Sequence, residues 1–135
     1  MIRELDQQQC YELLTTTTVG RIGFEYDGRV HIHPVNYALS GRDILLRTSH
    51  EGLLAAVTTV PAAVAFEVDY HDPLGANAWS VLMHGTLSRA PEEDAVGIAA
   101  RVHPWAGEDR DLALLLRIES MSGRSVQREK PRPEI

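Results

Sequence analysis

The residues best suited to chemistry lie at positions 47–52, where a guanidinium, two hydroxyls and a glycine follow one another closely. They read Arg47-Thr48-Ser49, with Gly52 three residues later. Backbone N–H groups at a helix N-terminus, beside hydroxyls and a charged side chain, favour an anion such as phosphate. Thr48 and Glu51 also have the spacing of a helix capping box. We therefore predict a phosphate site here, with capping of the next helix as the competing explanation for Thr48 and Ser49.

A second candidate is the pair His31 and His33, which a strand would place on one face. Two imidazoles at this spacing can bind a metal if a third ligand follows. Tyr37 and Ala38 stand where an acid would be needed. The remaining histidines are scattered, at His50, His71, His84 and His103. We expect no metal site, and histidines that lie on the surface or line a groove.

Trp79 and Trp105 are the only tryptophans, and each lies beside a segment with the composition of a loop. Their rings are suited to covering a flat heterocycle or to packing in a core. Both interpretations stay open from the residues alone. The sequence contains no phosphate-binding Walker loop, dinucleotide fingerprint, HExxH or GxSxG motif.

The elements that must position these residues are mainly strands. Alternating apolar and polar residues predict six strands, over 21–26, 30–37, 44–47, 64–68, 78–89 and 112–121. Asp27-Gly28 predicts a type I′ hairpin turn, because both positions need positive φ. Pro34 lacks an N–H group, so it predicts a bulge or a sheet edge there. We expect burial of the apolar faces represented by Ile22, Phe24, Val64, Phe66, Val81 and Leu116.

Three short helices are predicted between and around the strands. Asp6 can cap a helix over 7–16, in which Cys10 is buried among leucines. A second helix over 53–57 must end before Pro61. Pro91 and the acids after it predict a third helix, which reaches about Val102. Six mostly antiparallel strands with such helices indicate an α+β, mainly β barrel.

Composition limits the class of protein. With 135 residues, 44% of them hydrophobic and 24% charged, the chain is sized for one globular domain. We expect that domain over 1–124, followed by a charged, proline-rich tail over 125–135. The net charge of −6 argues against a nucleic-acid partner. No apolar run approaches the ~18 residues of a membrane span. We therefore expect a cytoplasmic protein without a membrane partner.

In their order and spacing, several of these segments resemble pyridoxamine 5′-phosphate oxidase-like proteins of the flavin-binding split-barrel superfamily. The similar segments cover about Asp6 to Arg124. They are QQCYELL, VGRIGF, the Asp-Gly turn, HPVNYAL, ILLRTS with a glycine after it, WSVLMHGTL, and PWAGEDRD followed by LRIESMSGR.

The resemblance implies a six-stranded antiparallel split β-barrel that forms a homodimer, with FMN in grooves at the interface. By position in the family motifs, the phosphate would meet Arg47, Thr48 and Ser49, near Gly52 and Leu53. The flavin ring would lie along the second strand, and rings and hydroxyls of later segments would complete the site. The implied residues are His33, Pro34, Val35, Asn36, Trp79, Ser80 and Trp105, with Trp79 and Ser80 coming from the other subunit.

The implied function is that of a flavin-dependent oxidoreductase acting on a small molecule. Many members of the family have a lysine just after the glycine, whereas this chain has Leu53 and Leu54. Weak or absent FMN binding is therefore an alternative. Others are a deazaflavin-dependent reductase, and a non-enzymatic protein that binds haem or another small ligand in the same groove. A haem would need an axial ligand such as His31, His33 or His84.

Overall fold

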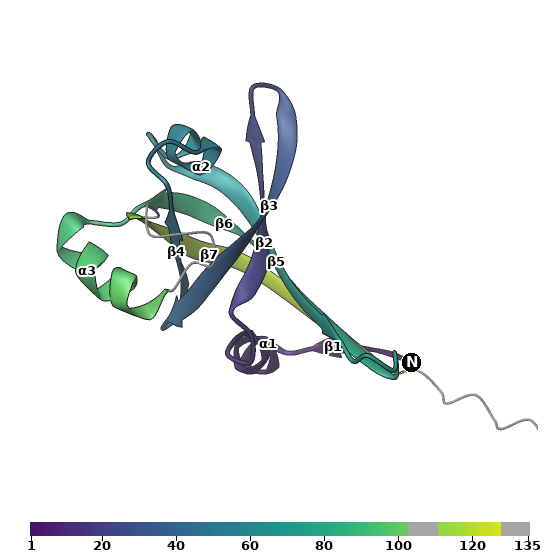
Figure 1. Ribbon diagram of the computed structural model, residues 1–135. Helices are drawn as coiled ribbons and strands as arrows, with labels where there is room; N and C mark the ends of the chain where they lie inside the picture. The colour runs from purple at the N-terminus through teal and green to yellow at the C-terminus, as the bar shows by residue number, and fades with distance from the viewer. Residues whose placement is uncertain (103–110, 128–135) are drawn as a thin grey trace, which may run out of the picture.

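An antiparallel sheet of seven strands curls into a split β-barrel in the computed structural model, which describes residues 1–102 and 111–127 (Figure 1). The strands are β1 Ile2–Leu5, β2 Val19–Tyr26, β3 Arg29–Ser40, β4 Asp43–Thr48, β5 Ala62–His71, β6 Asn77–Arg89 and β7 Leu112–Gln127; the helices are α1 Gln7–Leu14, α2 Leu53–Val57 and α3 Glu92–Arg101.

The barrel itself is formed by the six strands that the sequence predicts. Their order is β7-β4-β3-β2-β5-β6, and pairing of β6 with β7 closes the ring. The prediction of six strands in all was wrong, because β1 adds a seventh. It pairs with the end of β7, from Ile2 opposite Val126 to Leu5 opposite Gly123. β1 thus continues, along the same edge of β7, the ladder that β4 forms with Leu112 to Arg117.

The β2–β3 hairpin stands out from the barrel (Figure 1). Its turn confirms the prediction from Asp27-Gly28, because these residues have φ values of 53° and 75°. β3 pairs with β2 over residues 29–36 and with β4 only over residues 37–40. Pro34 lies in the first part, in a ladder without a bulge, so the predicted sheet edge is correct and the bulge is not.

The core lies inside the barrel and contains all six residues predicted for it. Ile22, Phe66, Val81 and Leu116 have no exposed surface, and Phe24 and Val64 are nearly as buried. A smaller apolar cluster lies between α3 and the outer face of β4 and β7, formed by Leu45, Ile98, Val102 and Ala113. The first half of β7 is therefore covered on both faces.

The helix predictions hold, except that α1 ends at Leu14 instead of near Thr16 and that the cap predicted before α2 is absent. Asp6 caps α1 in a full capping box: its carboxylate accepts from the Gln9 N–H at 2.8 Å, and the Gln9 side chain accepts from the Asp6 N–H at 2.9 Å. The capping box predicted at Thr48 and Glu51 was wrong. The chain first turns, and α2 begins after Gly52, which has no side chain to cap it.

β7 carries a bulge where it passes the middle of β6. His84 is opposite Ser120 while Gly85 is opposite Ile118, so Glu119 is the extra residue. Leu112, Leu114 and Leu116 point into the core before the bulge, and Met121 and Gly123 take over that side after it. A β-carbon on Gly85 would collide with the Arg117 carbonyl oxygen.

The predicted tail began too early, because β7 continues through Gln127 and pairs there with β1 and β6. Its remaining part, 128–135, and Trp105 lie outside the described residues. Within the residues described, no helix is long and apolar enough to cross a membrane.

Candidate functional site

The predicted phosphate residues lie at the end of β4, but their side chains point to opposite faces. Thr48 is buried on the same side of β4 as Leu46, toward the core. Arg47 lies on the other side, and its Nη1 donates to the Val102 carbonyl oxygen at 3.0 Å, just after α3. The structure thus gives Arg47 a structural contact that sequence reasoning did not find.

The turn between β4 and α2 contains Ser49 and leads to the uncapped N–H groups of α2. The Ser49 hydroxyl accepts from the Glu51 N–H at 3.2 Å, so it fixes the turn and does not cap α2. The first turn of α2 after Gly52 receives no side-chain hydrogen bond. Leu53, the first residue of α2, is partly buried against the core.

A second cation, which the sequence did not indicate, lies beside α2. Nη2 of Arg89, at the end of β6, donates to the Ala55 carbonyl oxygen at 3.0 Å. Arg89 and Leu46 are both opposite Leu114 of β7, so they share a face at the same end of the barrel. The Arg89 guanidinium, the Thr48 and Ser49 hydroxyls and the N–H groups of α2 are donors of the kind a phosphate accepts from, whereas Arg47 lies on the opposite face of β4. The residues present therefore fit a phosphate-bearing cofactor despite Leu53 and Leu54.

The second predicted segment, His33 to Asn36, adjoins this end of the barrel. It is opposite Ile22 to Val19 of β2, and the ladder to β4 begins at the next residue, where Tyr37 is opposite Leu46. The Asn36 amide donates to the Thr18 carbonyl oxygen at 3.4 Å. β3 and β4 therefore diverge between these two groups of predicted residues.

The Phe24 ring contacts both histidines of the hairpin, His31 and His33. It stacks on His31 at 5.4 Å and meets His33 edge-on at 5.1 Å, measured between ring centroids. In the part of the chain that the structure describes, no group of three or more His, Cys, Asp or Glu could hold a metal ion.

Trp79 and Ser80 lie near the other end of β6. Ten residues separate Trp79 from Arg89 along the strand, which is roughly 30 Å at ~3.3 Å per residue. Both residues line a pocket of about 350 Å³ together with Arg21, Asp69, His71 and Arg124. One chain therefore brings the segments on β3 and β4 close to one another and places Trp79 and Ser80 far from Arg89 along β6.

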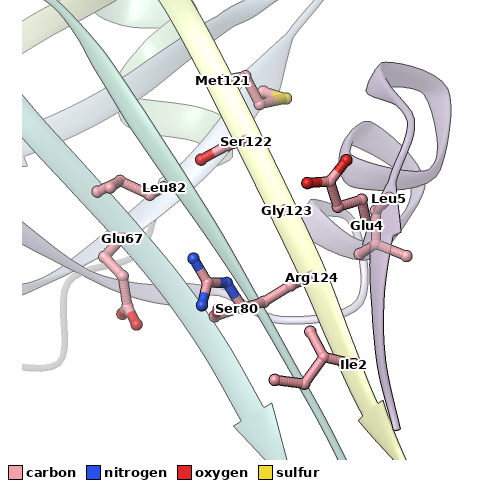
Figure 2. A pocket seen from close by; sticks show the side chains of 10 residues that line it. All are labelled: Ile2, Glu4, Leu5, Glu67, Ser80, Leu82, Met121, Ser122, Gly123 and Arg124. Carbon is pink, nitrogen blue, oxygen red and sulfur yellow. The ribbon is translucent and has the colours of Figure 1, made fainter.

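A larger pocket of about 680 Å³ is lined by residues of β1, β5, β6 and β7 (Figure 2). Ile2, Leu5, Leu82 and Met121 give it apolar walls; its polar lining is Glu4, Glu67, Ser80, Ser122 and Arg124. In Figure 2, the Arg124 side chain extends from β7 toward Ser80 of β6, and Glu67 lies on β5 beyond it.

Glu67 belongs to an ionic cluster that sequence reasoning missed. Nη1 of Arg21 lies 2.9 Å from Oε1 of Glu67 and 2.8 Å from Oδ2 of Asp69. Burial raises the pKa of Glu67 to about 7, and a hydrogen bond to Asp69 and the charge of Asp69 add to the effect. The pKa of Asp69 is lowered, chiefly by the hydrogen bond from Glu67. The alternation that placed Phe66 inside already placed Glu67 and Asp69 together outside, but it gave no sign of Arg21 between them.

Comparison with known proteins agrees with this architecture. The sequence pattern of the family described as pyridoxamine 5′-phosphate oxidase matches residues 6–125. An uncharacterised protein of Mycobacterium tuberculosis is 26% identical over 125 residues, which cover 89% of this chain and 82% of that protein.

Two solved structures show the same fold. A FAD-binding protein from Mesorhizobium loti has a TM-score of 0.80 and 20% identity, with 94% of this chain and 99% of that chain covered. A FAD- and haem-binding protein from Mycobacterium smegmatis has a TM-score of 0.73 and 12% identity, with 97% and 76% covered.

Proposed function

The chain belongs to the pyridoxamine 5′-phosphate oxidase family, and on that premise we propose that it binds FMN and acts as a flavin-dependent oxidoreductase on a small organic molecule. The observation that carries the proposal is a set of hydrogen-bond donors at one end of the barrel, of the kind that binds a phosphate. Arg47, Thr48 and Ser49 leave β4 there, and α2 and Arg89 lie beside them.

Arg89 could supply the positive charge that the missing lysine would have provided. Leu53 and Leu54 stand where many relatives have that lysine, yet the Arg89 guanidinium is held against α2 by the Ala55 carbonyl. That bond uses one of the five N–H donors of a guanidinium. Arg89 is therefore the residue we propose to neutralise a phosphate in place of the lysine, with the first-turn N–H groups of α2 as further donors.

We further propose that a homodimer completes the site. His33 to Asn36 would lie along the flavin ring, and Trp79 and Ser80 would come from the second copy, because within one chain Trp79 is ten positions, roughly 30 Å along β6, from Arg89. Trp105 is proposed from the family resemblance alone. The single domain is proposed to extend over all the described strands, through Gln127.

A bound flavin would supply the hydride chemistry. The residues of this chain would hold its phosphate, orient its ring along β3 and exclude water from it.

The absorption spectrum of the freshly purified protein tests this proposal. We expect the two visible bands of an oxidised flavin, and release of FMN, not FAD, on denaturation. A Soret band would instead identify a haem protein, whose axial ligand would be sought among His31, His33 and His84. If the protein has no visible absorption, FMN is added to it; no change in flavin fluorescence would contradict the proposal.

A further inference from the structure

The cluster of Arg21, Glu67 and Asp69 lies where β2 and β5 separate. Only three residue pairs join these strands, and Arg21 opposite Glu67 is the last of them. Asp69 lies beyond that pair on the same face of β5, so Arg21 reaches across the gap to it. Two carboxylates thus converge on a single nitrogen of one guanidinium.

This geometry leaves room for one proton between the two carboxyl groups. Two carboxylates that approach the same nitrogen repel each other, and one cation cannot neutralise both. A proton on Glu67 removes that repulsion and provides a hydrogen bond to Asp69. Burial is the largest cause of the raised pKa of Glu67, about 7, and the hydrogen bond to Asp69 and the charge of Asp69 add to it; the same hydrogen bond is the largest cause of the lowered pKa of Asp69. Below about pH 7, the pair therefore holds one exchangeable proton.

The other residues that surround Glu67 and Asp69 come from β1, β6 and β7 and from the end of β5. β7 contributes Arg124 and β1 contributes Glu4, which are opposite one another. His71 lies two residues beyond Asp69 and lines the smaller pocket with it. Opposite Glu67 and Asp69, β6 contributes Leu82 and Ser80, which carry no charge. Glu67 thus borders the 680 Å³ pocket from β5, with Leu82 and Ser80 of β6 between it and Arg124 of β7.

We propose that Glu67 donates its proton to a small organic molecule bound in this pocket. A perturbed carboxyl in a cleft, with a specific charged partner, is a common arrangement for proton transfer. The proposal deepens the proposed function and rests on it for its place in the reaction. Reduction of a polarised double bond consumes a hydride and a proton. A bound flavin would supply the hydride; Glu67 supplies the proton, becomes a carboxylate and recovers a proton from water.

A purely structural role for the cluster makes a different prediction. As a clasp between β2 and β5, Glu67 would be an ionised partner of Arg21, like any carboxylate in a salt bridge. It would then not deliver a proton to a reagent at neutral pH. A test therefore has to detect the proton on Glu67 and its transfer to a small molecule, without depending on cofactor or substrate.

A water-soluble carbodiimide with glycinamide as the amine provides that test. Coupling requires the carboxyl proton to move to a carbodiimide nitrogen while the carboxylate oxygen bonds to the central carbon; glycinamide then displaces the urea and forms an amide. Mass spectrometry of peptides compares Glu67 with Glu25, an exposed carboxyl on β2. At pH 7, a carboxyl with a pKa of about 7 is protonated about a hundredfold more often than one near the ordinary 4.5.

We expect the Glu67 to Glu25 labelling ratio to rise at least tenfold between pH 5 and pH 7, since this ratio cancels differences in access that do not depend on pH. Asp69→Asn, with its fold checked by circular dichroism, should reduce that rise several-fold. A ratio that stays constant with pH would overturn the proposal. Titration with FMN under the same conditions keeps the two ideas apart: failure to bind FMN contradicts the proposed function, whereas the labelling ratio reports on Glu67 alone.

Discussion

Glu67→Gln should change the dependence of stability on pH in a direction that is unusual for a glutamate. The folded protein holds the Glu67 proton up to a pKa of about 7, whereas the ordinary value is 4.5. The folded state therefore binds more protons than the unfolded state between these values, and its stability falls as pH rises from 4.5 through 7. The glutamine side chain of the variant cannot ionise, but its amide can still donate to Asp69 and accept from Arg21.

The magnitude follows from the same interval. The full difference between the two pKa values corresponds to about 3 kcal/mol of unfolding free energy. The Glu67 side chain is 32% exposed and its neighbour Asp69 is 37% exposed, so solvent screening reduces the effect, and we expect about 1 kcal/mol. Glu67→Gln should equal the wild type at pH 5 and exceed its stability by about that amount at pH 8.

Urea unfolding at pH 5 and pH 8, at one fixed protein concentration, measures this difference. Glu25→Gln is the matched control, because it makes the same substitution at an exposed position on β2. Asp69 does not disturb the comparison, since its lowered pKa places its titration below this window. Equal destabilisation of Glu67→Gln at both pH values would refute the reasoning, because it would show that Glu67 is an ionised partner of Arg21.

Three further predictions concern the cofactor end, the assembly and α1. Arg89→Ala and Arg47→Ala should each weaken FMN binding by roughly 1.5 to 3 kcal/mol in a flavin fluorescence titration, the value of a charge-assisted hydrogen bond; unchanged affinity in both would remove the phosphate site from this end of the barrel. Light scattering should give twice the chain mass of 15.0 kDa, and a monomer would contradict a site shared between two copies. Asp6→Ala should cost about 1 kcal/mol of unfolding free energy in urea, because the bond from the Gln9 N–H to the Asp6 carboxylate is lost, while Asp6→Asn should cost much less.

Local signals in the sequence were enough for much of the barrel. Asp27-Gly28 predicts its turn because few residues accept positive φ, and Asp6 predicts the start of α1 because its partner Gln9 is three residues away. The barrel ladder follows from alternation, as the burial of Phe66 and Val81 shows. These interactions join residues that are near in sequence or that repeat with a simple period.

What escaped prediction depends on distant partners. β1 is four residues long and is a strand only because the end of β7 lies beside it, about 120 positions later in the chain. The contacts of Arg47 with Val102 and of Arg89 with Ala55 are likewise set by how helices lie on the barrel. Thr48 is the opposite case, a local signal that failed: its spacing to Glu51 matches a capping box, but the chain turns before Gly52 and α2 begins without a side-chain cap.

The bulge at Glu119 limits how the length of β7 can change. Because Glu119 is the extra residue, deleting it alone would make His84–Ser120 and Gly85–Ile118 neighbouring pairs and leave Met121 on the core side. Deleting one residue later in β7 would instead turn every following side chain over and place Arg124 toward the core. Gly85 would still lie against the Arg117 backbone, with no room for a β-carbon. Single-residue insertions and deletions after residue 119 should therefore be excluded among functional variants, while a change of two residues would preserve the side each residue occupies.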